Sequence, residues 1–186
     1  MTGWTRWLTI WRTRLMADEK TTATEFEPSV YDTTIRRTFD APRERVFEAW
    51  TDPERVEQWW GPAEFTVPYC ELDVRPDGEF RIDMQGPDGT IYPDTGVYHV
   101  VDEPERLEVT SRALEDEDGI PQLEVYQTVT FAERGEQTEL TIRAEVIRAS
   151  EAVADSLEGM EQGWSQSLDK LEGFIADGSA VPSTSD

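Results

Sequence analysis

The chain of 186 residues is strongly acidic: 40 Asp and Glu oppose 17 Lys and Arg, which gives a net charge of −23. A surface this short of cations argues against nucleic acid as a partner, because phosphate contacts require Lys and Arg. The single Cys excludes an internal disulfide. We expect one domain, residues 31–177, with a core large enough to fold without cross-links.

The spread of the charge indicates the solvent to which the surface is adapted. Acidic residues occur in every segment after residue 16, and the only lysines are Lys20 and Lys170. In molar salt the screening length falls to about 3 Å, which removes the repulsion between such carboxylates. We therefore predict a cytoplasmic protein of a salt-loving cell. The alternative, an acidic patch for a basic partner, requires the charge to gather on one face.

Residues 1–15 differ in composition from the rest of the chain. They contain three Arg and no acidic residue, and their large apolar side chains recur at helical spacing, at Trp4, Trp7, Leu8, Trp11 and Leu15. Two interpretations stay open: a small helix in a membrane interface, or a wrongly chosen start codon ahead of Met16. The segment is too short to span a bilayer. We expect residues 1–30 to be a disordered extension.

Two short helices are predicted between Thr38 and Pro62. The first opens at Pro42, whose fixed φ and missing N–H suit the first helical position. The second has Asp52 as its N-cap and Pro53 at its first position, and Gly61 followed by Pro62 ends it. Such a short pair cannot fold alone, so it must lie across a sheet.

The sheet is predicted from Glu64 to Val146, where short alternating runs are separated by turn signals such as Pro76-Asp77-Gly78 and Pro87-Asp88-Gly89. This pattern is typical of an antiparallel meander with one buried face and one wet face. The buried positions of two of the strands are Phe80, Ile82 and Met84, and Leu140, Ile142 and Ala144. A further strand is expected from Gly96 to Val101.

A long amphipathic helix follows the sheet, with Ser150 as its N-cap. Its apolar residues are three and four apart and form one stripe, at Val153, Leu157, Met160, Trp164, Leu168, Leu171 and Ile175. The helix is expected to end near Asp177, before a disordered tail of residues 178–186. Gly159 and Gly163 lie on neighbouring turns and permit close approach of another backbone, either the sheet or a second subunit in a homodimer.

Two segments carry a resemblance to a known family. The pattern AP-x-E-x-VF-x-A-x-TDPE-x(4)-WWGP from Ala41 to Pro62, and GMEQGWSQSLDKL from Gly159 to Leu171, resemble the SRPBCC or START-like superfamily, in the branch named after the activator of Hsp90 ATPase homologue. The resemblance implies an α+β helix-grip fold. In that fold a curved antiparallel sheet, with two short helices after its first strand, holds a long C-terminal helix across its concave face and leaves a cavity between them.

The sequence shows no pattern typical of a catalytic or metal-binding site. His99 is the only histidine, and strand alternation turns it toward solvent. Cys70 lies in a predicted strand without a cationic neighbour, which favours packing over nucleophilic chemistry. The acidic run from Glu115 to Asp118 does not fit the register of a calcium loop and is interpreted as a turn. We predict no catalytic residue, metal or cofactor.

Seven residues are expected to line a ligand cavity. They come from the helix pair, the sheet and the long helix, and they are Trp60, Phe80, Met84, Ser111, Gln127, Met160 and Trp164. The alternation of the strand Leu123–Phe131 turns Gln127 inward, where its buried amide needs partners. Gln127 and Ser111 either orient a ligand or bond each other. We expect no ionisable side chain to face the cavity, which favours binding over proton transfer.

Three functions remain candidates. The first is a non-enzymatic domain that binds an apolar or amphipathic small molecule. The second is a protein-interaction module akin to the co-chaperone domain that names the branch; the namesake's chaperone-activating role is not carried over, because it accompanies an extra N-terminal domain. The third is an enzyme of the polyketide-cyclase kind, which the superfamily also contains and which needs an ionisable group in the cavity.

Overall fold

The computed structural model describes residues 32–116, 120–150 and 153–178, so the predictions for residues 1–31 and 179–186 lie outside the described residues. Helices and strands follow one another in a simple order. They are β1 (Asp32–Phe39), α2 (Arg43–Thr51), α3 (Pro53–Trp59), β2 (Thr66–Leu72), β3 (Glu79–Gln85), β4 (Ile91–Asp102), β5 (Arg106–Glu115), β6 (Pro121–Arg134), β7 (Gln137–Ala149) and α4 (Ala154–Ala176).

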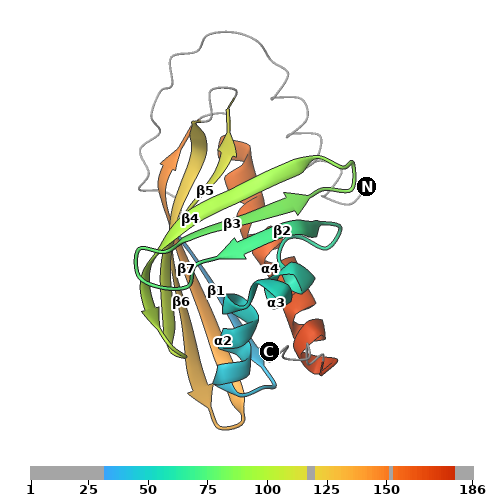
Figure 1. The fold of residues 1–186 in the computed structure, drawn as a ribbon, viewed down its shortest axis with the longest axis vertical. Coiled ribbons are helices and arrows are strands. Elements are labelled where there is room, and N and C mark those ends of the chain that lie inside the picture. Colours follow the sequence, from blue (N-terminus) through green and yellow to red (C-terminus); the bar gives the residue numbers. More distant parts are fainter. Residues whose placement is uncertain (1–31, 117–119, 151–152, 179–186) are drawn as a thin grey trace, which may run out of the picture.

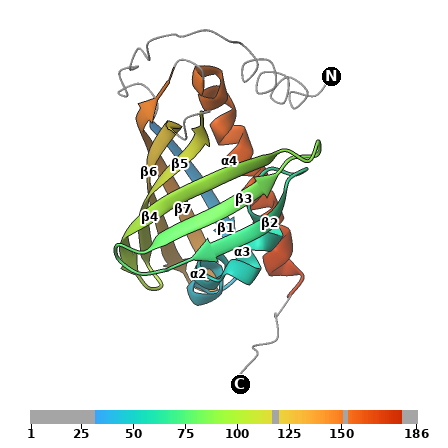
Figure 2. The same ribbon diagram turned by 45° about the horizontal axis from the view of Figure 1, so that its top comes forward.

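The strands form one antiparallel sheet in the order β1-β7-β6-β5-β4-β3-β2. The sheet curls around α4: in Figure 2, β4, β3 and β2 pass in front of the helix, while β6 and β7 stand to its left. Helices α2 and α3 fill one end of the curl (Figure 1). The predicted α+β helix-grip fold is confirmed, with one strand, two short helices, six further strands and a long helix.

The ends of α2 and α3 follow from their capping residues. Asp52 accepts a hydrogen bond of 3.0 Å from the backbone N–H of Glu54, and Pro53 is the first residue of α3, as predicted. The predicted start of α2 is one residue too early, because Pro42 has an extended ψ of 149° and is the N-cap. Gly61 then turns the chain after α3 with φ +82°, a conformation that favours glycine.

Strand β4 is longer than predicted and begins at Ile91, five residues before Gly96. Gly96 pairs with Phe80 of β3, and the Phe80 ring covers it. A Cβ on Gly96 would lie 2.2 Å from the carbonyl oxygen of Thr110 and 2.5 Å from the Phe80 ring. Because glycine has no side chain, the Phe80 ring and the Thr110 carbonyl can approach the backbone of β4 closely at this point.

Helix α4 begins at Ala154, with Val153 in the N-cap position, so the prediction of Ser150 as the N-cap is wrong. Ser150 ends the sheet instead: its N–H bonds the carbonyl of Gln122, and its own carbonyl accepts from Val153. Five of the seven residues of the apolar stripe are buried, and Leu168 and Leu171 are fully enclosed in the main core, whereas Met160 and Trp164 are half-buried. A Cβ on Gly163 would meet no atom within 4 Å, so close approach of the sheet does not explain the glycine at this position.

Two clusters of buried side chains stabilise the grip. The main cluster joins α2, α3 and the C-terminal half of α4 to the sheet, with Trp59 and Phe131 among its fully buried members. The second cluster packs Val153, Leu157 and Met160, at the start of α4, against β6 and β7. In the described part of the chain, no helix is long and apolar enough to cross a membrane.

Candidate ligand-binding site

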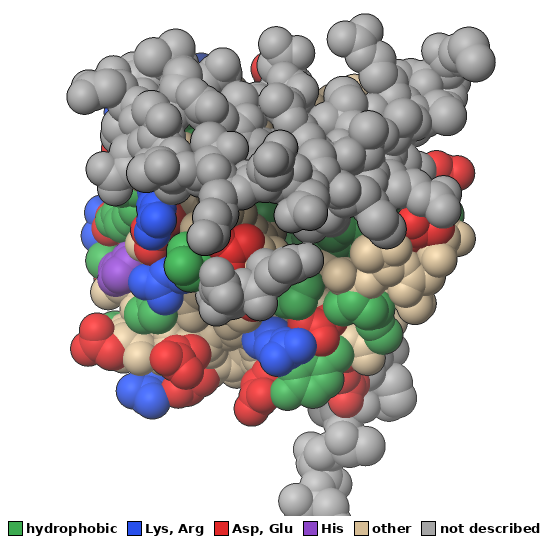
Figure 3. Space-filling view, turned by 90° about the horizontal axis from the view of Figure 1, so that it is seen from above, with side chains coloured by type: hydrophobic (Ala, Val, Ile, Leu, Met, Phe, Trp, Pro, Cys, Tyr) green, Lys and Arg blue, Asp and Glu red, His purple; other side chains and the backbone are tan. Residues whose placement is uncertain are grey.

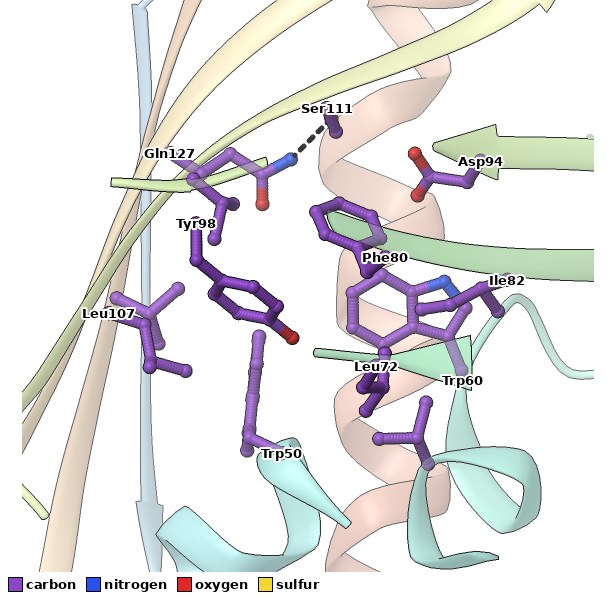
Figure 4. Close-up of a pocket in the computed structure, with 13 residues that line it drawn as sticks. Trp50, Trp60, Leu72, Phe80, Ile82, Asp94, Tyr98, Leu107, Ser111 and Gln127 are labelled. Carbon is purple, nitrogen blue, oxygen red and sulfur yellow. Dashed lines mark hydrogen bonds between the residues drawn. The ribbon is translucent and has the colours of Figure 1, made fainter. Parts of the chain in front are cut away.

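A hollow opens between the inner face of strands β2 to β6 and the helices α2 and α3 (Figure 4). Its walls are mainly apolar, and their aromatic members are Trp50 of α2, Trp60 after α3, Phe80 of β3 and Tyr98 of β4. Burial keeps the Tyr98 phenol protonated, since it raises the pKa of Tyr98 well above its ordinary value, and the charges of Cys70 and Asp94 add to that rise. In Figure 4 the Tyr98 hydroxyl points into the hollow.

The hollow is small and open to solvent. The space that the centre of a water-sized sphere can reach inside it is about 30 Å³. This space holds about two water molecules or one small chemical group. It lies well below the range of about 300–1,000 Å³ that is usual for ligand pockets.

Gln127 and Ser111 meet on one wall of the hollow, as strand alternation predicts. Both are buried, and the Gln127 Nε2 donates a hydrogen bond of 3.0 Å to the Ser111 Oγ. This pairing leaves the Gln127 carbonyl oxygen turned into the hollow, as Figure 4 shows. Of the two arrangements that the sequence left open, the residues thus bond each other, and the free amide oxygen still offers an acceptor to a ligand.

Asp94 of β4 brings a carboxyl group into the same hollow, so the prediction that no ionisable side chain faces it is wrong. The residue as a whole is half-buried, but its Oδ1 is fully enclosed and has no hydrogen-bond partner. Burial raises the pKa of Asp94 from 3.8 to about 7. An unpaired carboxyl group whose pKa is shifted in a cleft marks a candidate functional group.

The sequence does contain a local signal for Asp94. Tyr98 faces the core, and steps of two back along β4 lead through Gly96 to Asp94, which therefore shares the inner face. The predicted strand begins only at Gly96, which places Asp94 in a loop. The true start at Ile91 is fixed by pairing with β3, where Asp94 lies opposite Ile82.

A second unpaired polar atom belongs to Trp50. This side chain is only 6% exposed, it lines the hollow, and its indole N–H has no hydrogen-bond partner. The neighbouring Trp59 differs, because its N–H donates to the carbonyl of Ala49 at 2.8 Å. A buried N–H without an acceptor is costly, so a water molecule or another group that accepts this hydrogen bond would stabilise the site.

Four of the seven residues predicted for the cavity lie together around the hollow: Trp60, Phe80, Ser111 and Gln127. The other three lie elsewhere. Trp164 of α4 stacks on Trp50 with ring centres 5.8 Å apart and also contacts Trp60, so it supports the wall from behind. Met160 belongs to the second core cluster, and Met84 packs against the turn at Gly61.

The long helix therefore contributes no residue to the lining among the described side chains. The sequence could not reveal this, because Trp164 is on the inner stripe of α4 as expected. Trp164 packs against two of the wall residues, Trp50 and Trp60, and does not line the hollow itself. The direct role of Met84, Met160 and Trp164 in ligand binding stays a prediction.

The remaining reactive side chains lie outside the hollow. His99 is exposed on the outer face, where its Nε2 lies 2.8 Å from the Thr110 Oγ1 and its ring stacks on Tyr126. Cys70 is half-buried against the main core, and burial, with smaller contributions from Glu57 and Asp52, raises its pKa to about 12. Such a thiol is unreactive at neutral pH. Within the described ranges, no group of three or more His, Cys, Asp or Glu could hold a metal ion.

The family model of the "Activator of Hsp90 ATPase homolog 1-like protein" matches residues 40–176 of this chain. The chain belongs to this family. The match contains the helix pair, six of the seven strands and α4, and therefore every residue that lines the hollow. No curated protein gives a significant match.

Solved structures from bacteria share the fold. A solution structure from Arthrobacter aurescens is 23% identical with a TM-score of 0.71, and covers 89% of this chain and 99% of its own. A crystal structure from Chromobacterium violaceum is 27% identical with a TM-score of 0.66, and covers 78% of this chain and 96% of its own. The AHSA1 protein from Silicibacter pomeroyi is 23% identical with a TM-score of 0.67, and covers 79% of this chain and 99% of its own. At identities of 23% the likeness shows the fold alone.

Proposed function

We propose that this domain binds a small molecule with an apolar body in the hollow between the sheet and helices α2 and α3. The observation that carries the proposal is the convergence of three polar groups on an apolar, aromatic-walled hollow: the amide oxygen of Gln127, the hydroxyl of Ser111 and the carboxyl of Asp94. Apolar walls with a few convergent polar groups are typical of ligand sites.

The dimensions of the hollow limit how such a ligand binds. A space of about 30 Å³ accepts only a small group, so the apolar body has to lie toward solvent. Among the apolar lining residues, Trp60, Leu72 and Val109 are half-buried and can contact such a body. We therefore expect an amphipathic ligand with a compact polar end directed inward.

The first experiment is native mass spectrometry, with organic extraction, of protein purified from a halophilic host. A co-purifying small molecule in defined stoichiometry supports the proposal and identifies the ligand class. Its affinity is then measured by calorimetry for the wild type and for Gln127→Leu. We expect the variant to bind at least about tenfold more weakly, because its side chain cannot accept the ligand's hydrogen bond.

Thr128→Val is the matched control, since Thr128 follows Gln127 on β6 and alternation turns it to the outer face. Both variants are first checked for folding by thermal unfolding. An unchanged affinity in a folded Gln127→Leu protein would show that the amide does not orient the ligand. A protein that is empty and that no small probe stabilises would contradict the proposal as a whole.

The family name supports a second candidate, a domain that binds another protein. In that case the protein purifies with a defined partner chain, and Gln127→Leu leaves the partner's affinity unchanged because Gln127 is buried. Asp94 supports the third candidate, a polyketide-cyclase-like enzyme, because it supplies the ionisable group that proton transfer requires. A turnover screen in which Asp94→Asn is inactive would favour it.

A further inference from the structure

Asp94 has no counter-ion in the hollow. Among the described side chains that line the hollow, Asp94 is the only Asp or Glu, and Lys, Arg and His are absent. Its Oδ1 is enclosed and accepts no hydrogen bond from the protein. Buried carboxylates are normally paired or hydrogen-bonded. The partner of this one must therefore be a proton, water or the ligand.

The charged residues on the neighbouring strands are engaged elsewhere. On β3, Arg81 and Asp83 flank the inward-facing Ile82, and they bind each other at 2.8 Å. On β5, Arg112 precedes Ala113, the partner of Asp94, and it pairs with Glu124 at 2.8 Å. These ion pairs lie on the opposite face of the sheet by strand alternation.

The helices that close the hollow also leave Asp94 without a cation. Arg55 of α3 pairs with Glu48 at 3.2 Å and with Asp52 at 3.1 Å. Lys170 of α4 donates to the carbonyl oxygens of the turn after α3. The other titratable group in the hollow is the Tyr98 phenol, which burial keeps neutral.

The rest of the lining suits a cation that Asp94 would attract. Four aromatic rings face the hollow, from Trp50, Trp60, Phe80 and Tyr98. The faces of such rings attract ammonium groups, most strongly where water is excluded. The free oxygen of Gln127 adds a neutral hydrogen-bond acceptor (Figure 4). One carboxylate, an acceptor and aromatic walls without a basic residue are complementary to a protonated amine.

We propose that the hollow selects ligands that carry a small protonated amine, which pairs with the Asp94 carboxylate beside the aromatic rings while the apolar part of the ligand extends toward solvent. This inference rests on the proposed binding function and names the chemical class of its ligand. It distinguishes the site from one for neutral or anionic amphiphiles, which gain nothing from an unpaired carboxylate.

The test uses three probes that share one ring: benzylamine, benzyl alcohol and benzoate. Their affinities for the full-length protein are measured by calorimetry at constant molar KCl, one pH unit above and one below the Asp94 pKa of about 7. We expect benzylamine to bind at least about tenfold more tightly than benzyl alcohol at the higher pH. The preference should shrink at the lower pH, where Asp94 is protonated, and benzoate should bind most weakly.

Two variants assign the preference to the carboxylate. Asp94→Asn keeps the shape but not the charge, and should bind both benzylamine and benzyl alcohol with similar affinity at both pH values. Asp83→Asn, the control, removes a carboxylate from the outer face of the neighbouring strand and should keep the preference for the amine.

The possible results separate this inference from the binding function itself. Benzyl alcohol or benzoate binding as tightly as benzylamine would overturn the amine preference and leave the binding function standing. An amine preference that survives in Asp94→Asn would also overturn it. If none of the three probes binds and no small molecule co-purifies, the binding function fails and the inference fails with it.

Discussion

Asp94 couples the candidate site to the stability of the fold. In an unfolded chain an Asp side chain ionises near pH 4, whereas in the folded protein the pKa of Asp94 is about 7 because burial disfavours its charged form. Between these values the folded state holds a proton that the unfolded state has lost. Raising the pH through this window therefore lowers the free energy of unfolding, and above pH 7 the loss is complete.

We predict that Asp94→Asn is more stable than the wild type at pH 8 and nearly equal to it close to pH 4. We expect a gain of about 2 kcal/mol at pH 8. The full pKa shift of Asp94 would correspond to a larger gain, at about 1.4 kcal/mol per pKa unit. Solvent screens the half-buried Asp94 side chain and reduces this value. Urea unfolding across this pH range measures it.

Asp83→Asn serves again as the control, since it breaks an outer ion pair with Arg81 and should bring no gain at pH 8. A pH-independent difference between Asp94→Asn and the wild type would show that the carboxyl group is not buried as described. A residue whose ionised form opposes folding is typical of a functional site, where stability is given up for activity.

At the scale of elements, Lys170 joins α4 to the turn that follows α3. Its Nζ lies within hydrogen-bonding distance of the carbonyl oxygens of Trp60 (3.2 Å), Gly61 (3.3 Å), Pro62 (3.5 Å) and Phe65 (3.1 Å). Burial lowers the pKa of Lys170. The turn has no regular secondary structure of its own, so hydrogen bonds from this ammonium group to its carbonyl oxygens tie the turn to α4 and help to hold Trp60 at the wall of the hollow.

We predict that Lys170→Met lowers the free energy of unfolding by about 2 kcal/mol, because methionine fills the same space but donates no hydrogen bond to the carbonyl oxygens. Asp169→Asn, one residue earlier, removes a largely exposed ion pair with Arg37 and should cost less than about 1 kcal/mol. Urea unfolding followed by tryptophan fluorescence measures both. Equal effects would show that the carbonyl contacts of Lys170 do not stabilise the turn.

At the scale of the whole molecule, the acidic surface should make stability depend on salt. Figure 3 shows carboxylates and cationic side chains interspersed on the described part of one face, where the acidic side chains do not gather in one place. Many of the ion pairs are exposed and contribute little individually, as for Arg75 with Asp73 and Arg143 with Glu145. A net charge of −23 therefore acts mainly as distributed self-repulsion.

We predict that the free energy of unfolding rises by at least about 2 kcal/mol between 0.1 M and 2 M KCl, which corresponds to a rise of roughly 4–8 °C in Tm. Urea unfolding is suitable because urea is uncharged. Sucrose, which stabilises without screening charge, is the control and should not reproduce the effect at low concentration. A stability that stays flat or falls as KCl increases would contradict adaptation to salt.

The amino-acid sequence was sufficient to predict the features that depend on local chemistry and strand alternation. Turn residues separate the strands, Asp52 and Pro53 fix the start of α3, and the period of two places Gln127 and Ser111 on the inner face. Each of these signals lies within a few residues of the feature that it predicts. The order of the elements and two of the polar residues that line the hollow could therefore be predicted from these signals, whereas the helix-grip arrangement was implied by the family resemblance.

Tertiary packing was needed to establish how far each inward side chain lies from the hollow and what lies opposite it. Strand β4 extends back to Ile91 because β3 pairs with it, and that pairing turns Asp94 from a loop residue into an enclosed carboxyl group. Trp164 has the predicted inward position, yet it packs against Trp50 and Trp60 and does not line the hollow. Strand alternation predicts which face of the sheet a side chain lies on. How deeply the side chain is buried and which residues it contacts are determined only when distant segments pack together.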